Sequence, residues 1–269
     1  MIAALALAGA GTLALSASAQ DRPMLPGGNW AGMLDETDGG HRFGNPEAKT
    51  RLVEFMSYTC SHCAEFARKG DAAIKLSYVS TGKISYEVRH LIRDPVDLTA
   101  ALLTHCGDEK KFGGNHEAIM YRFDEWMDKA RNATQAQRSR WQFGSHSARF
   151  QAIASDLDFY DIMQGRGYTR SQIDACLSDE AKAQAMAEQS AADIAKYGLP
   201  GTPSFVLDGE LLEGTHNWPA LEKRLEEAEA AAEAAAQAAA ENARRLDSSR
   251  PSNLKRELIT ELRTKSFDE

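Results

Sequence analysis

The chain has no excess of positive charge, few cysteines and only one long apolar run. Its 31 Lys and Arg residues are outnumbered by 39 Asp and Glu, which gives a net charge of −8. That balance excludes nucleic acid as a main partner, because phosphate backbones are bound by basic surfaces. The hydrophobic fraction of 43% and charged fraction of 26% are ordinary for a soluble globular protein.

The one long apolar stretch is residues 1–18, which is short for a membrane span. It ends in Ala17-Ser18-Ala19, the small-residue pattern of a signal-peptide cleavage site, so residues 1–19 are predicted to be a signal peptide. No Lys or Arg precedes the apolar run, and an uncleaved anchor is the alternative. Export would place the chain where disulfides persist.

Only four cysteines are present, and two of them stand three positions apart, as Cys60 and Cys63. The residues before them, Arg51 to Ser57, have the composition of a buried strand, and those after them favour a helix. A thiolate at a helix N-terminus is stabilised by unpaired N–H groups and the helix dipole. Such a pair can cycle between dithiol and disulfide, with the outer sulfur attacking and the inner one resolving.

Two other interpretations of this pair are weaker. A structural zinc site needs four ligands, and the remaining cysteines, Cys106 and Cys176, stand alone and far apart. An inert disulfide across two intervening residues closes too small a loop to stabilise a fold much.

The order of predicted elements is that of an α/β protein interrupted by helices. A strand over 51–57, a helix toward Tyr78 with a kink at Gly70, and a strand over 84–92 imply a right-handed parallel crossover. Helices are then predicted over 96–105, 115–129, 148–163, 171–177 and 179–197, with 131–146 as a loop or frayed helix. A hairpin over 204–212, turning at Asp208-Gly209, and a helix from about Asn217 follow.

This order divides the chain into six parts. They are a signal peptide (1–19), a flexible leader (20–40), a first sheet segment (41–94), a helical insertion (95–189), a second sheet segment (190–225) and an Ala/Glu-rich tail (226–269). The composition of the tail predicts a solvated helical spacer, which ends at Arg250-Pro251. A last short helix with Leu254, Leu258, Ile259 and Leu262 on one face could dock elsewhere or pack weakly on its own chain.

Together, the redox pair between strand and helix, the helical insertion and Gly201-Thr202-Pro203 before a later strand resemble the DsbA family of secreted, periplasmic thiol–disulfide oxidoreductases. The resemblance runs from about His41 to Arg224. It implies a thioredoxin-like mixed sheet with an inserted helical domain, to which this chain adds a helical C-terminal extension. It also implies a periplasmic location.

Residue by residue, the resemblance makes Cys60 the nucleophile, Cys63 the resolving thiol and Pro203 a cis-proline beside them. Thr202 would then offer its backbone to an extended substrate. Glu54 would be a buried acid that trades protons with Cys63; the alternative is an ion pair with Arg89 on the next strand.

The residue between the cysteines, His62, lies within reach of the Cys60 sulfur, where a protonated imidazole would stabilise the thiolate. A solvated helix residue is the alternative. Ser61 and Thr202 depart from the family's best-known oxidases, and they leave the direction of electron flow open.

Cys106 and Cys176 are predicted to form a second, structural disulfide within the insertion, the alternative being two unpaired buried thiols. The histidines show no metal-binding spacing; His116-Glu117 lacks the second histidine of the zinc-protease signature. Neither a metal nor a cofactor beyond the redox disulfide is therefore expected.

The leading hypothesis is an enzyme that introduces disulfides into exported proteins. Isomerase or reductase activity is the first alternative, and a non-enzymatic holdase chaperone is the second. The expected partners are unfolded or cysteine-containing exported polypeptides and a membrane or soluble redox protein that recharges the disulfide. The tail could also support oligomerisation.

Overall fold

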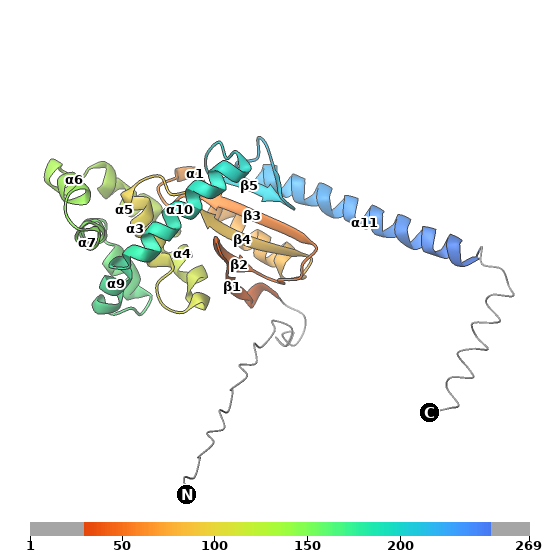
Figure 1. Cartoon of the computed structure of the whole chain (residues 1–269), viewed down its shortest axis with the longest axis horizontal. Helices are drawn as coiled ribbons and strands as arrows, with labels where there is room; N and C mark the ends of the chain where they lie inside the picture. The colour runs from red at the N-terminus through yellow and green to blue at the C-terminus, as the bar shows by residue number, and fades with distance from the viewer. Residues whose placement is uncertain (1–29, 249–269) are drawn as a thin grey trace, which may run out of the picture.

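The computed structural model describes residues 30–248, and a single mixed sheet lies at its centre (Figure 1). Its strand order is β1-β2-β4-β3-β5-β6. The central pair, β3 (Thr50–Met56) and β4 (Ile84–His90), is parallel, and every other neighbouring pair is antiparallel. The predicted crossover is therefore confirmed, and it places the carboxyl end of β3 directly before the cysteine pair.

The segment between β3 and β4 is helical but not uniformly so. It begins as α1 (Ser61–Phe66) and α2 (Ala72–Ile74), with π-helical turns at Ala67–Asp71 and Lys75–Val79. The first π turn contains Gly70, so the predicted kink takes the form of a widened turn. Gly82 ends the segment with a φ of +75°, a conformation that glycine adopts without steric cost.

One strand and the first residue of a second form where a flexible leader was expected. β1 (Leu34–Glu36) pairs with β2 (Gly40–Phe43), and β2 pairs with β4. The prediction for 20–40 is thus wrong for residues 30–40. The Gly- and Asp-rich composition there serves a tight turn, because the Thr37 hydroxyl accepts the Gly40 N–H at 3.0 Å and donates to Glu87 at 2.6 Å.

The helical insertion begins with α3 (Pro95–Thr104), α4 (Phe112–Tyr121) and α5 (Phe123–Arg131). It continues with α6 (Gln135–Gln142), α7 (His146–Asp156), α8 (Phe159–Gly165) and α9 (Arg170–Leu177). Two predicted helices are therefore each divided, at Arg122 and at Leu157-Asp158. The expected loop over 131–146 is largely the helix α6, which a capping box at Thr134 and Gln137 initiates.

The chain returns to the sheet through α10 (Glu180–Tyr197), which runs from the helical insertion to the sheet in Figure 1. The hairpin of β5 (Ser204–Leu207) and β6 (Glu210–Leu211) follows as predicted. One continuous cluster of buried apolar side chains includes both sheet residues, such as Leu52, and insertion residues, such as Trp126. The insertion is therefore packed against the sheet through a shared core.

The last described element is α11 (Trp218–Ser248), which buries Leu221 and Leu225 and then projects from the body (Figure 1). Most of its Ala/Glu-rich part is exposed, as predicted for a spacer, although Lys83 pairs with Glu229 at 3.6 Å. Among residues 30–248, no helix is long and apolar enough to cross a membrane. The predicted signal peptide (1–19) and the short helix with Leu254 lie outside the described residues.

Candidate active site

The cysteine pair lies at the junction of β3 and α1. Cys60 is the N-cap of α1, and the Cys63 N–H donates to its Sγ at 3.3 Å. Both thiols are free and buried, with exposed fractions of 5% for Cys60 and 0% for Cys63. The predicted arrangement, an outer sulfur at the helix terminus and an inner one a turn deeper, is therefore present.

The two thiols differ in acidity. Hydrogen bonds from the Cys63 thiol, and from the N–H groups of Cys63 and His62, lower the pKa of Cys60 to about 5 despite its burial. Burial raises the pKa of Cys63 well above its ordinary value, and its hydrogen bond to Cys60 adds to the effect. At neutral pH, Cys60 is accordingly the thiolate nucleophile and Cys63 the thiol.

Titrating the reduced protein should therefore reveal one thiolate that forms near pH 5. The measurement is thiolate absorbance in the ultraviolet between pH 3 and 9, with Cys60→Ser as the control that should lose the transition. A single transition near the ordinary thiol pKa of about 8.5 would contradict the geometry.

The residues before β5 face the nucleophile. The Thr202–Pro203 peptide is cis, as expected for Pro203, and the Thr202 carbonyl oxygen lies 3.3 Å from Cys60 Sγ. An open cleft of about 390 Å³ lies beside them, lined by Thr59–His62, Leu91, Arg93, Gly201 and Thr202. A partner sulfur could reach Cys60 through this cleft.

His62 lies at the surface in the first turn of α1. Its side chain is exposed, and no hydrogen bond between its imidazole and Cys60 occurs in the described chain. What His62 supplies to the sulfur is its backbone N–H. Stabilisation of the thiolate by the imidazole therefore stays a prediction.

Glu54 is buried on β3, with an exposed fraction of 3%, so it points inward as predicted. Burial, followed by the nearby Asp71 carboxylate, raises its pKa well above the ordinary value. The alternative ion pair with Arg89 is wrong: the parallel register sets Arg89 opposite Phe55, and Arg89 pairs with Glu87 and Asp193 instead.

A chain of buried polar groups extends from Glu54. The Tyr86 hydroxyl donates to Glu54 and lies 3.2 Å from Asp71 Oδ1. Asp71 Oδ2 is 3.3 Å from His116 Nε2, and His116 Nδ1 is 3.0 Å from the Tyr58 hydroxyl. These buried groups can hold or exchange protons close enough to Cys63 for the Glu54 charge to act on its thiol. The resemblance to the DsbA family implied such a role for Glu54 alone.

Replacing Glu54 with Gln should make stability less dependent on pH. Because the pKa of Glu54 is raised on folding, its contribution to stability is fully present below about pH 4.3 and is lost as the pH rises toward the folded-state pKa. Urea unfolding of the oxidised protein from pH 4 to 9 should therefore show a shallower decline for Glu54→Gln. The exposed Glu47→Gln serves as the control, and equal slopes in all three proteins would contradict a buried neutral Glu54.

The comparisons with known proteins agree with this geometry. Residues 36–227 match a family model described as Thioredoxin, which is well over half of the chain. The chain belongs to the thioredoxin family. Within it, relatives named for protein-disulfide oxidoreductase and protein-disulfide isomerase activity show a thiol–disulfide oxidoreductase.

A protein from Rickettsia bellii, provisionally named a protein-disulfide oxidoreductase, is 28% identical over 72% of this chain and 67% of its own length. A Rickettsia typhi relative with the same provisional name is 27% identical and is covered over 53% of its length. The chain thus spans about half to two thirds of these curated relatives.

Among solved structures, a protein-disulfide isomerase from Novosphingobium aromaticivorans is 46% identical, with a TM-score of 0.68. The similarity covers 71% of this chain and 97% of that one. Wolbachia pipientis alpha-DsbA1 shares the fold, with 22% identity, a TM-score of 0.52, and coverage of 70% of this chain and 83% of that one.

Two carboxylates that the sequence analysis missed shape the active-site loop of this thioredoxin-family chain. Asp97 accepts hydrogen bonds from the Ser57 hydroxyl at 2.6 Å and from the Tyr58 N–H at 2.7 Å. Asp94, the N-cap of α3, accepts one from the Thr59 hydroxyl at 2.8 Å. They therefore fix the approach to Cys60 from the start of the insertion. An Asp-Pro-x-Asp pattern signals a helix start but not this second task.

The other two cysteines lie in the helical insertion. Cys106 and Cys176 form a disulfide with a Cα–Cα distance of 5.7 Å. Cys106 follows α3 and Cys176 belongs to α9, the first and last helices of the insertion. The predicted bridge is therefore present, and it leaves Cys60 and Cys63 as the exchanging pair.

Proposed function

We propose that this chain is a net oxidase that introduces disulfides into exported polypeptides. The observation that carries the direction is the contrast between Cys60, with a pKa of about 5, and Cys63, whose pKa is raised. A stabilised thiolate favours the reduced protein, which makes the Cys60–Cys63 disulfide a strong oxidant.

In the oxidative direction, a substrate thiolate attacks Cys60 Sγ of the disulfide form, and the Cys60–Cys63 bond breaks. Cys63 leaves with the electron pair and takes a proton, which the buried Glu54 network, whose charge acts on Cys63, can supply. A second substrate thiolate then attacks the substrate sulfur of the mixed disulfide and releases Cys60 as a stable thiolate. Two substrate thiols lose two electrons, and the cysteine pair gains them.

The surface beside Cys60 supports a polypeptide as the substrate. The cleft at Thr202 shares Thr59 and Arg93 with a second groove of about 380 Å³. That groove is bounded by residues of α3, α5 and α6, which include Met127 and Trp141. An extended chain whose cysteine contacts Cys60 could therefore lie across both hollows, with apolar side chains in the second.

Equilibration with glutathione tests the direction of exchange. A net oxidase should have a potential close to about −120 mV, the value for the strong oxidant DsbA, and above the about −180 mV of protein disulfide isomerase. The fraction of reduced protein is measured by alkylation and mass, with Cys106→Ala/Cys176→Ala as the control that isolates the Cys60–Cys63 couple. A potential near the −270 mV of thioredoxin would overturn net oxidation while leaving thiol exchange intact.

Disulfide isomerisation is the second candidate. The Novosphingobium aromaticivorans protein is named a protein-disulfide isomerase, and it is 46% identical to this chain. An isomerase needs the reduced form to attack wrong disulfides, and α11 offers a long helix through which two copies could associate. Reactivation of a scrambled multi-disulfide protein by the reduced chain, together with dimerisation that truncation after residue 226 abolishes, would favour this candidate.

The proposed cellular role includes export and recharging by an external redox partner. Alkylation trapping in cells tests both: a mainly oxidised Cys60–Cys63 pair in the exported fraction is expected for an oxidase. A mainly reduced pair would instead support the isomerase or reductase alternative.

A further inference from the structure

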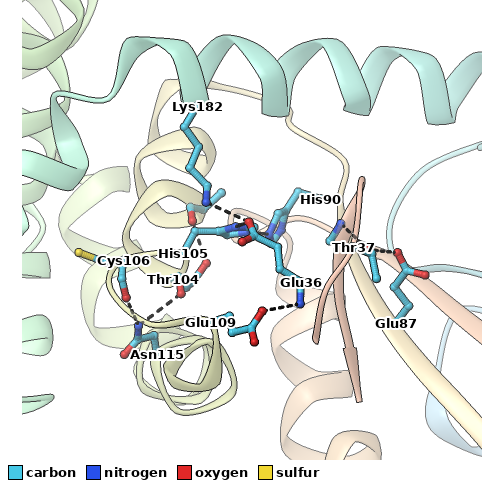
Figure 2. Close-up of polar contacts among 12 residues, drawn as sticks. Glu36, Thr37, Glu87, His90, Thr104, His105, Cys106, Glu109, Asn115 and Lys182 are labelled. Carbon is cyan, nitrogen blue, oxygen red and sulfur yellow. Dashed lines mark hydrogen bonds and ion pairs between the residues drawn. The ribbon is translucent and has the colours of Figure 1, made fainter. Parts of the chain in front are cut away.

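Three side chains far apart in the sequence converge where the first strands meet the helical insertion. They are Glu36 at the end of β1, His41 on β2, and His105, which follows α3. One ligand atom of each lies within 4.8 Å of the corresponding atoms of the other two. Figure 2 shows the Glu36 carboxylate and the His105 ring meeting below the Lys182 ammonium.

Two of the three ligand atoms have a separation that suits ligands of one ion. His105 Nδ1 lies 3.7 Å from Glu36 Oε1, which is too long for a hydrogen bond. Two ligands of a tetrahedral zinc ion, each bound at about 2.0–2.1 Å, lie roughly 3.4 Å apart. A shift of a few tenths of an ångström would therefore bring both within coordinating distance.

One buried nitrogen of each histidine has no hydrogen-bond partner in the described structure. His41 is 1% exposed and the His105 side chain 6%, yet Nδ1 of each lacks a hydrogen bond in the described structure. Buried polar atoms in proteins are nearly always bonded, so such unsatisfied atoms point to a missing water or ion. The two unsatisfied imidazole nitrogens lie close to each other and to the Glu36 carboxylate, and together these groups form a donor set that binds metal ions.

Neighbouring groups hold the rings in position. His105 Nε2 lies 2.8 Å from His90 Nε2, which allows His105 to donate its second N–H while Nδ1 keeps a free lone pair. Metal-binding histidines are commonly oriented in this way. The His41 ring is stacked on Phe112, with centroids 3.8 Å apart and planes 3° from parallel.

Two of the three proposed ligands, Glu36 and His105, also face a cavity. This cavity of about 130 Å³ is lined by Glu36, His90, His105, Lys182 and neighbouring residues. Lys182 Nζ lies 3.1 Å from Glu36 Oε1, and a third of its side chain is exposed. The lysine charge therefore occupies the approach to the carboxylate, and it can move outward when a cation enters.

We propose that Glu36, His41 and His105 form a binding site for a divalent transition metal ion such as Zn²⁺. Two imidazoles and a carboxylate are ligands that Zn²⁺ accepts, with a fourth position open to water. The ion would link the β1–β2 edge of the sheet to the end of α3, the first helix of the insertion. Its ligand there, His105, directly precedes Cys106 of the disulfide.

Titration calorimetry of the full chain with ZnCl₂ tests the site. The protein is first oxidised at Cys60 and Cys63, because free thiols bind zinc themselves. We expect one Zn²⁺ ion per chain and a raised melting temperature, because an ion that binds only the folded state stabilises it. Failure to bind would overturn the metal site and leave the proposed redox function untouched.

Three variants locate the ion. Glu36→Gln, at a half-exposed position, should weaken binding by at least about tenfold, and His105→Gln should weaken it at least as much. Lys182→Met should tighten binding, by roughly tenfold, because it removes a positive charge next to the dication. A residue with a purely structural role would not produce this gain.

His146→Ala is the matched control, since His146 Nδ1 also lies 3.7 Å from a carboxylate, Glu180, but belongs to no described three-ligand group. It should bind zinc as the native chain does. Equal affinity of the native chain, Glu36→Gln and His105→Gln would refute the site, as would unchanged or weaker binding by Lys182→Met. Circular dichroism shows which variants remain folded.

Discussion

Replacing Cys60 with Ser should abolish disulfide transfer, with a loss of at least about a thousandfold in the rate of oxidation of a dithiol peptide. The reason is chemical: the outer sulfur forms the mixed disulfide, and a hydroxyl with an ordinary alcohol pKa cannot replace a thiolate whose pKa is about 5. The Ser hydroxyl is smaller than the thiol, so the fold should remain intact.

Cys63→Ser is the informative partner of this variant. It keeps the nucleophile but lacks the resolving thiol, so mixed disulfides between Cys60 and substrate chains should accumulate instead of turning over. Non-reducing gels and mass spectrometry measure the trapped species. The pair of variants therefore separates attack from resolution, two steps that a single activity assay combines.

A Cys60→Ser protein that kept full biological activity would contradict the enzymatic proposal and support the holdase alternative. Oxidation of a dithiol peptide and suppression of client aggregation, measured side by side on both variants, distinguish the two outcomes. A catalytic protein that also binds unfolded chains would lose oxidation and keep only the suppression.

Sequence was informative wherever a feature depends on neighbouring residues. The β3–α1 junction, the Thr202–Pro203 step and the β5–β6 hairpin each have a local pattern, and the structure contains all three. These patterns are sufficient because strand periodicity, helix starts and turns are determined within a few residues. Most helices of the insertion were likewise located, although their ends and breaks were not.

Features that depend on long-range contacts could not be read in this way. β1 is three residues long, and it becomes a strand because β2 and β4 pair beside it. The buried groups around Glu54 are Asp71 from the π-helical turn before α2, Tyr86 from β4 and His116 from α4. They are too far apart in the sequence for any spacing pattern to connect them. His41, His90 and His105 likewise meet only in the folded chain, which is why the histidines showed no metal-binding spacing.

The disulfide between Cys106 and Cys176 carries the second large expected effect, on stability rather than on activity. The bridge closes a span of 70 residues. In the chain-entropy model, a loop of that size restricts the unfolded chain by roughly 4 kcal/mol. Because the bond joins the end of α3 to α9, its loss leaves the ends of the insertion held together by packing alone.

Cys106→Ala/Cys176→Ala should therefore unfold at a temperature roughly 8–16 °C lower, the shift that about 4 kcal/mol causes in a protein of this size. Calorimetry of both proteins with Cys60–Cys63 reduced measures the difference, and the single variant Cys176→Ala controls for lost side-chain packing. Oxidation of a dithiol peptide at 25 °C should remain close to the native rate, because neither sulfur lies among the residues that line the Cys60 cleft. An unchanged melting temperature would show that packing alone holds the insertion, and a loss of oxidation in the folded variant would show that the bridge belongs to the active site.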